Sequence, residues 1–315
     1  MDKIAVHQQA QAATVEVNPS TELKLGIVLV TAAAVAWSFG GVLGRIVTLE
    51  DSWAIIFWRS IWACLFLLGF MLFRNKLRGT YMMFRYMGWP GLAVALCFAT
   101  ASTSFIVALK YTSVANILLI QAGVPLIAAL IAWIIFREKV SGPTWLAIAV
   151  VIAGVGVMVS ESFTGEVSPI GDSLALLIAF CFATATVITR RYAHVRMAPA
   201  VCTGTIIAAI FSGAMASSLA TSSYDTGLLF VFGALNLGLG LALFVTGARL
   251  LPSPIAALIG TAEPMLGPLW VWIFLNEVPT RLTLIGGGII LIALIAHLLW
   301  QMAHHRRVMV AATPN

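Results

Sequence analysis

The feature that most constrains this chain is a succession of ten apolar runs, each about 17 to 23 residues long. A helix needs about 20 apolar residues to cross the hydrocarbon core of a bilayer, so every run is long enough to span it. The runs cover residues 25–46, 53–73, 87–109, 114–136, 144–160, 172–190, 199–220, 227–248, 254–276 and 282–300. The pattern predicts an all-α integral membrane protein with ten transmembrane helices.

Charge is scarce in the composition. Only 10% of the 315 residues are charged, whereas soluble domains average about 25%. The mean hydropathy is +1.00. Such a chain cannot cover a water-soluble surface, and ten spans leave no room for a large soluble domain. These observations exclude an ordinary soluble enzyme.

The net charge of +6 does not indicate a nucleic-acid binder, because the cations are scattered between the apolar runs and form no basic face with aromatic platforms. The four cysteines lie inside apolar runs, and neither they nor the histidines have the spacing of a metal site. We therefore expect no cofactor, no metal and no nucleic-acid partner. The expected partners are a small-molecule substrate and the lipid bilayer, and the expected assembly is a monomer or a homodimer.

Positive charges in the connections predict how the chain is oriented, because Lys and Arg resist translocation. Fourteen of these residues fall on the side that holds both termini. The other side has three, namely Arg45, Lys110 and Arg281. Both termini are therefore expected to be cytoplasmic.

The connections are short, so consecutive helices are expected to be antiparallel neighbours. The longest runs from Arg74 to Arg85 and is predicted to be a basic connection of about a dozen residues. Residues 1–22 are predicted to form a disordered cytoplasmic tail and residues 303–315 a second cytoplasmic tail.

The chain resembles itself when it is shifted by 139 residues, which brings Ile120 onto Ile259. The identities in this register are Ile120 with Ile259, Pro125 with Pro264, Leu130 with Leu269, Trp133 with Trp272, Ile134 with Ile273 and Glu138 with Glu277. A weaker register pairs Arg45 with Arg190 in the earlier helices. We interpret residues 23–160 and 172–300 as two five-helix repeats. Because five is odd, the second repeat crosses the membrane in the opposite sense, an inverted topology typical of transporters.

The ends of the matching helices carry a family resemblance. The first runs from Pro125 to Phe136-Arg137-Glu138-Lys139, and the second from Glu263-Pro264 to Leu275-Asn276-Glu277. With its ten spans in paired halves, the chain resembles the EamA-type members of the drug/metabolite transporter superfamily. The resemblance implies an inner-membrane carrier of small metabolites, and bacterial exporters of amino acids, including aromatic ones, are the nearest group. Val124 stands where the second half has Glu263, so the halves are not chemically equivalent.

Two ionisable residues lie well inside the predicted spans. Glu263 is an acid at a depth where charge costs about 2.5 to 3.5 kcal/mol, so it should face protein or a water-filled cavity. It could bind a proton or a substrate ammonium, or act as a structural carboxyl beside Pro264. Arg59 could bind a carboxylate, pair with Glu263, or extend its guanidinium to the headgroups.

Prolines and small polar residues mark the middle of the spans. Pro125, Pro264 and Pro268 remove backbone hydrogen bonds, so they are candidate hinges or helix breaks as well as tolerated kinks. Polar residues at similar depth are candidates for the cavity wall, although each could equally be a link between helices. They include Ser38, Thr100, Asn116, Gln121, Thr184, Asn236 and Thr261. Among the aromatic residues, Trp37 lies far from both interfaces, where tryptophans usually occur; Phe39 and Trp270 are further candidates.

The committed binding site is a subset of these residues. The predicted substrate-binding set is Trp37, Ser38, Phe39, Arg59, Thr100, Gln121, Thr184 and Glu263. Glu138 and Glu277 are expected to make structural contacts at helix ends.

The sequence favours a secondary transporter that exports small amphipathic metabolites, most plausibly neutral or aromatic amino acids, by alternating access. A proton-coupled carrier of drugs or of other metabolites, such as nucleotide sugars, is the alternative. An intramembrane enzyme is remote, because the spans contain no HExxH, no GxSxG and no His/Asp grouping.

Overall fold

The chain forms a bundle of membrane-spanning helices. The computed structural model describes residues 19–160, 168–192 and 196–311, and these contain helices but no strands. Nine helical spans are long and apolar enough to cross a membrane, and a bent helix pair at Val114–Ala122 and Val124–Phe136 makes a tenth. The predicted all-α membrane fold with ten spans is confirmed.

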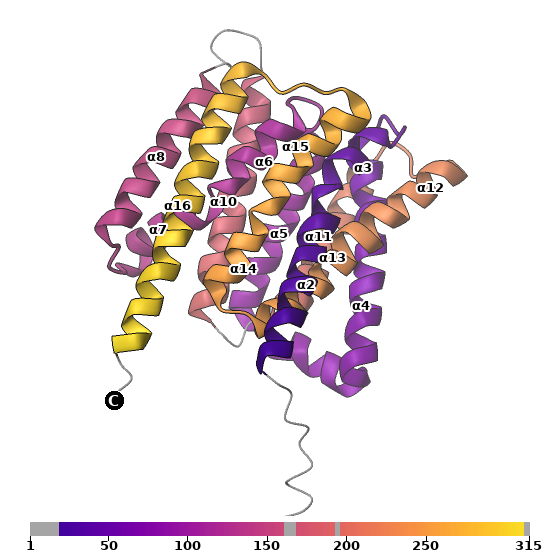
Figure 1. The fold of residues 1–315 in the computed structure, drawn as a ribbon. Coiled ribbons are helices and arrows are strands. Elements are labelled where there is room, and N and C mark those ends of the chain that lie inside the picture. The colour runs from indigo at the N-terminus through magenta and orange to yellow at the C-terminus, as the bar shows by residue number, and fades with distance from the viewer. Residues whose placement is uncertain (1–18, 161–167, 193–195, 312–315) are drawn as a thin grey trace, which may run out of the picture.

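The helices of the two halves follow in chain order (Figure 1). The first half contains α2 (Pro19–Ser38), α3 (Gly40–Ile46), α4 (Ser52–Arg85), α5 (Gly88–Ala108), α6 (Val114–Ala122), α7 (Val124–Phe136) and α8 (Gly142–Val159). The second contains α10 (Pro169–Arg191), α11 (Met197–Met215), α12 (Ser223–Phe230), the π-helix η1 (Val231–Leu239), α13 (Gly240–Gly247), the 3₁₀ helix η2 (Ala248–Leu250), α14 (Ser253–Gly260), α15 (Ala262–Leu275) and α16 (Arg281–Ala311).

Two predicted boundaries differ from the structure. The connection from Arg74 to Arg85 is helical and continues α4 after a kink at Lys76, where φ is 58° and ψ is 178°. Figure 1 shows this last part of α4 turned across the end of the bundle. Helix α16 continues to Ala311, past the predicted start of the tail at residue 303. Residues 1–18 and 312–315 of the predicted tails lie outside the described residues.

Both described ends of the chain lie on the same side of the bundle, at the bottom of Figure 1. We call this the terminus side, and the side that holds Arg45 and Glu277 the opposite side. Helix α2 runs from the terminus side to the opposite side, whereas α10, its counterpart, runs the other way. The two halves therefore cross the bilayer in opposite senses, as an inverted repeat requires.

The fourth span of each half is broken at the same place. Helix α6 gives way to α7 at Gly123, and α14 gives way to α15 at Thr261. The C-caps that end α7 and α15 are both left-handed, at Arg137 (φ 52°) and Asn276 (φ 54°). These caps are 139 residues apart, which is the shift found in the sequence, so the repeat extends to backbone detail.

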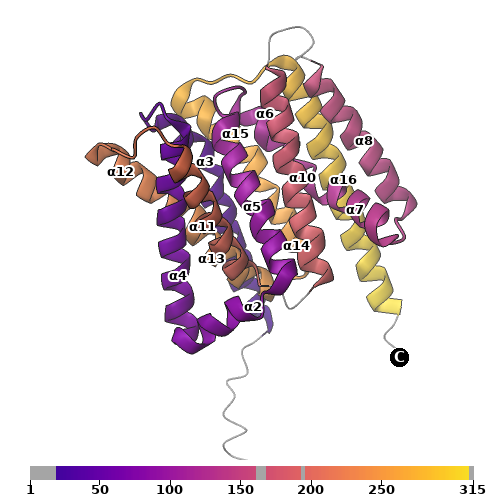
Figure 2. The same ribbon diagram turned by 180° about the vertical axis from the view of Figure 1, so that it is seen from behind.

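The helices of one half pack mainly on those of the other. Helix α2 packs on α13 and α15, and α10 correspondingly packs on α5 and α7. Three further contacts join equivalent helices of the two halves: α4 with α11, α6 with α15, and α8 with α16. Figure 2 shows α10 beside α5 on the far face of the bundle. The interface between the halves therefore runs through the whole molecule.

Glycines allow the closest of these contacts. A Cβ atom on Gly286 of α16 would lie 2.5 Å from the carbonyl oxygen of Gly154 on α8, and a Cβ on Gly154 would lie 2.9 Å from the Gly286 carbonyl oxygen. Neither helix backbone can move away without losing its neighbour, so only glycine fits at both positions. The sequence Gly286-Gly287-Gly288 thus supplies a packing surface.

We expect Gly286→Ala to lower the free energy of unfolding by about 1–3 kcal/mol, because the new methyl group would overlap a backbone oxygen. Thermal unfolding in detergent micelles measures the loss. Gly288→Ala in the same helix is the matched control, since a Cβ there would have no neighbour within 4 Å. An equal loss in both variants would contradict the proposed close contact.

Candidate functional site

The first span of the chain is interrupted between Ser38 and Gly40, near the middle of the bundle. The side chain of Asn236 on η1 supports the break, because its amide Nδ2 donates to the carbonyl oxygen of Ala36 at 2.5 Å and to that of Trp37 at 3.5 Å. A carbonyl freed inside a membrane needs such a donor. Asn236 itself lies in a π-helix, a geometry frequent at functional sites.

Helix α15 of the second half completes the surroundings of this break. The indole Nε1 of Trp270 donates to Ser38 Oγ at 2.9 Å, and its ring stacks on Phe39 with centroids 5.1 Å apart. Ser38 Oγ in turn donates to the carbonyl oxygen of Val35 at 2.7 Å. Gly267 allows α15 to come this close, since a Cβ there would lie 3.4 Å from the Ser38 carbonyl oxygen. The break thus joins side chains from α2, η1 and α15.

Trp37 points to another helix. Its ring lies 5.4 Å from that of Phe244 on α13, and a Cβ on Gly240 would fall 2.3 Å from its indole nitrogen. The indole Nε1 is buried and has no hydrogen-bond partner among the described residues. The predicted neighbours Trp37, Ser38 and Phe39 therefore contact different helices of the second half.

Arg59 on α4 is buried, with 7% of its surface exposed. Its guanidinium carbon lies 4.4 Å from the ring centroid of Phe232 on η1 and 5.8 Å from that of Phe105 on α5. Its Nη1 donates to the carbonyl oxygen of Ser102 at 3.4 Å, a long hydrogen bond, and its Nε has no partner in the described chain. The guanidinium is therefore held by aromatic faces, with no ion pair to an acid in the described part of the chain.

Glu263 lies in the first turn of α15 and is half-buried. Within residues 19–160, 168–192 and 196–311 it makes no hydrogen bond or ion pair, so the predicted alternative of an Arg59–Glu263 pair is not formed in the described structure. Its carboxyl group is left free to bind a proton or a cation.

The remaining predicted residues are spread over other helices. Thr100 on α5 is exposed and lies apart from the break. Gln121 is half-buried near the end of α6. Thr184 on α10 is half-buried, and its Oγ1 has no partner in the part of the chain that is described. The structure therefore brings together Ser38 and Phe39, with Arg59 linked through η1, and leaves the other three residues separate.

The prolines follow the helix breaks instead of lying at their centres. Pro125 and Pro264 lie in the first turns of α7 and α15, where a missing N–H costs little. Pro268 is the proline inside a helix. The bend between α6 and α7 is 47°. Whether these positions act as hinges stays a prediction.

On the opposite side, an ion pair joins the two halves. Arg45 Nε lies 2.9 Å from Glu277 Oε2, and their side chains are 29% and 23% exposed. The guanidinium also donates to the carbonyl oxygens of Leu109 and, at 3.0 Å, Thr112. The second oxygen of Glu277 accepts from the backbone N–H of Val114 at 2.8 Å, at the N-terminus of α6. Every charge in this cluster is thus well satisfied.

Further hydrogen bonds close the same side. Asp225 accepts from the backbone N–H and the hydroxyl of Thr48, at 2.9 and 2.8 Å. Asp51 accepts from the backbone N–H and the hydroxyl of Ser217, at 2.9 and 2.7 Å. Each of these links connects a residue of the first half to one of the second, so the halves are tied together at this end.

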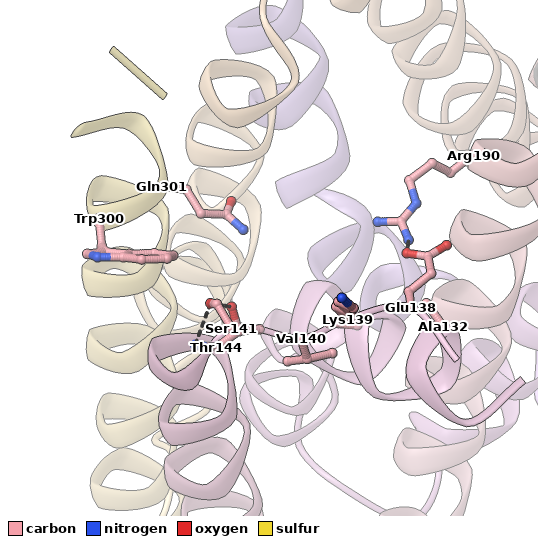
Figure 3. Close-up of a pocket in the computed structure, with 10 residues that line it drawn as sticks. Ala132, Glu138, Lys139, Val140, Ser141, Thr144, Arg190, Trp300 and Gln301 are labelled. Carbon is pink, nitrogen blue, oxygen red and sulfur yellow. Dashed lines mark hydrogen bonds and ion pairs between the residues drawn. The ribbon is translucent and has the colours of Figure 1, made fainter. Parts of the chain in front are cut away.

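On the terminus side, a second ion pair joins Arg190 at the end of α10 to Glu138 after α7. These side chains are 60% and 43% exposed, about twice the exposure of the first pair. The pair lies at a pocket of about 220 Å³ between the ends of α7, α10 and α16. Figure 3 shows Arg190 reaching Glu138 on one side of the pocket, with Trp300 and Gln301 on the other.

Sequence reasoning named Asn236 and Trp270 only within larger groups, and it did not foresee the pairing of Arg45 with Glu277. The signal for that pairing was present in the two repeat registers, one joining the arginines and one the glutamates. No group of three or more His, Cys, Asp or Glu side chains in the described residues could hold a metal.

Two interlocked five-helix halves of opposite sense, with a polar and aromatic junction between them, define a membrane transporter built from an inverted repeat. The model of the EamA-like transporter family matches residues 24–160 and again residues 169–299. The chain belongs to the EamA-like transporter family, and it is a multi-pass membrane transporter of small metabolites.

The fold also occurs among solved structures. One of them, described only as a crystal structure of a protein, has a TM-score of 0.62 and 16% sequence identity, and the match covers 88% of this chain and 98% of that chain. At this identity the likeness concerns the fold alone. A comparison with curated protein sequences gives no match.

We expect Asn236→Ala to lower the free energy of unfolding by about 1–3 kcal/mol, because the carbonyl oxygen of Ala36 would lose its donor inside the bundle. Thermal unfolding in detergent measures the change. Asn75→Ala is the control, since Asn75 also donates to a carbonyl oxygen, that of Met71, but near the water-exposed end of α4. Equal stability of the Asn236 variant and the wild type would contradict the role assigned to this side chain.

Proposed function

We propose that this transporter exports small amphipathic metabolites, most plausibly neutral or aromatic amino acids, across the inner membrane by alternating access. The observation that carries the proposal is Arg59. It is a buried cation within a membrane span, and no acid in the described chain neutralises it. Uncompensated charge at this depth is costly and usually functional.

The surroundings of Arg59 favour a particular cargo. A carboxylate would neutralise the guanidinium and accept the hydrogen bonds that its Nε lacks. The rings of Phe105 and Phe232 beside it suit an apolar or aromatic body. A phosphate-rich cargo such as a nucleotide sugar would call for several cations, and Arg59 is the one buried cation in the described spans.

Glu263 supplies the second half of the argument. It is an acid in α15 with no partner in the described chain, and it could hold either the ammonium group of an amino acid or a proton that drives transport. Trp270, two turns further along α15, stacks on Phe39 and links this helix to the break in the first span. We propose Trp37, Ser38, Phe39, Arg59 and Glu263 as the core of the binding region.

The proposed orientation follows from the charges in the connections. The terminus side carries most of the Lys and Arg residues and is the cytoplasmic side in this proposal. The opposite side, which the Arg45–Glu277 pair closes, then faces outward. The inverted halves can exchange conformations and expose one central site to either side.

Uptake into proteoliposomes tests the cargo, using a panel of labelled amino acids, sugars and cationic drugs. We expect neutral or aromatic amino acids to move and Arg59→Gln to reduce their flux by about tenfold or more, because the carboxylate loses its charged partner. Arg59→Lys should retain part of the flux. Arg281→Gln, at an exposed cation on a span end, is the control. Transport of the cationic drugs alone would refute the amino-acid proposal.

Glu263→Gln separates the two roles of the acid. If Glu263 carries the driving proton, collapsing the pH gradient reduces wild-type flux, and the glutamine variant becomes insensitive to the gradient. If it binds the ammonium group, the variant raises KM for amino acids at any gradient. Wild-type flux that ignores the pH gradient would exclude obligatory proton coupling.

A further inference from the structure

The two ion pairs on opposite sides of the bundle are related by the internal repeat. Arg45 ends the first span of the first half, and Arg190 ends the first span of the second half. Glu277 and Glu138 each follow a left-handed cap at the end of the fourth span. Each arginine pairs with the glutamate of the other half. The same contact therefore occurs twice, once at each side of the membrane.

The two copies of the contact are not in the same state. The Arg45–Glu277 pair is the more buried, and four elements meet there: the end of α3, the segment after α5, the start of α6 and the residue pair after α15. For Arg190, Glu138 is the single polar partner among the described residues, and both side chains are largely exposed beside the 220 Å³ pocket. One copy is sealed and the other is at the surface.

We infer that the two ion pairs are the alternating gates of the transporter, with the opposite side closed in this structure. In the exchanged state Arg190 and Glu138 form the sealed cluster, and Arg45 and Glu277 become the exposed pair. The inference rests on the proposed alternating-access function, but it makes no use of the cargo.

The repeat register predicts the contacts of the exchanged state. The shift of 139 residues brings Leu109 onto Ala248, Thr112 onto Leu251 and Val114 onto Ser253. Arg190 should therefore donate to the carbonyl oxygens of Ala248 and Leu251. Glu138 should accept from the backbone N–H of Ser253, at the N-terminus of α14, as Glu277 now does at α6.

The physical basis is a balance between two similar clusters. Each cluster gains charge-assisted hydrogen bonds only when its own side is closed, and closing one side separates the elements on the other. Two clusters built from the same residue types have similar free energies. The two states are then close enough in energy for cargo to exchange them, and weakening one cluster must favour the other state.

Glutamine substitutions test this balance. Glu277→Gln removes the charge but keeps an oxygen for the Val114 N–H, and Glu138→Gln makes the equivalent change on the terminus side. Nitroxide labels at Tyr111 and Val278 report on the opposite side, and labels at their repeat counterparts Leu250 and Lys139 report on the terminus side. Distances are measured by pulsed electron spin resonance on the full-length protein in liposomes without cargo, with the four native cysteines replaced.

Glu277→Gln is expected to raise the ratio of long to short distances at Tyr111–Val278 by about tenfold and to lower it at Lys139–Leu250. Glu138→Gln is expected to do the reverse. Glu50→Gln and Glu22→Gln are matched controls on the two sides, because neither carboxylate makes an ion pair in the described structure. Movement of both gate variants in the same direction, or no movement in either, would overturn the inference.

A charge reversal guards against simple loss of fold. Arg45→Glu combined with Glu277→Arg keeps an ion pair and should return the distance distribution toward that of the wild type. Arg45→Lys keeps the charge but loses the forked contacts to Leu109 and Thr112, so it should shift the distances as Glu277→Gln does. A purely structural pair would lower thermal stability in these variants without moving the two label pairs in opposite directions. That result would also refute the gate assignment while leaving the cargo proposal untouched.

Discussion

The constraint that governs this protein is that every backbone polar group inside the hydrocarbon core needs a partner within the protein. Continuous helices satisfy it by themselves, but a transporter also needs breaks at the level of its cargo. In this chain a side chain from the opposite half supplies the missing donor, as Asn236 does for the carbonyl of Ala36. The breaks must therefore lie at the interface between the halves, and the same interface holds Ser38, Phe39 and Trp270.

The inverted repeat explains why this interface has two ends of the same kind. Helices that are equivalent in the two halves pack on each other, and non-equivalent contacts occur in pairs. Glycine contacts such as Gly154 with Gly286 hold the outer part of the interface at a fixed distance. Charged side chains are confined to its two ends. The rigid and the exchangeable contacts thus occupy different levels of the same surface.

The sequence predicted the spans and the repeat well, because hydropathy depends on local composition and because Pro, Trp and Glu rarely coincide by chance. It did not predict the helix after Lys76, since a short basic segment with aromatic residues reads as a loop when its neighbours are unknown. The direction of Trp37 could not be read either, because the break at Phe39 turns adjacent side chains toward different helices. The pairing of Arg45 with Glu277 joins distant parts of the chain, so it required the fold.

The kink at Lys76 has a mechanical consequence. Its φ and ψ values fall in a region that glycine favours, yet the residues on both sides are helical. The second and third spans are consequently joined by a stiff crank instead of a slack tether, with Leu77 and Tyr81 exposed along it. Any tilt of α4, which carries Arg59, is transmitted directly to the base of α5, so these two helices swing as a single lever.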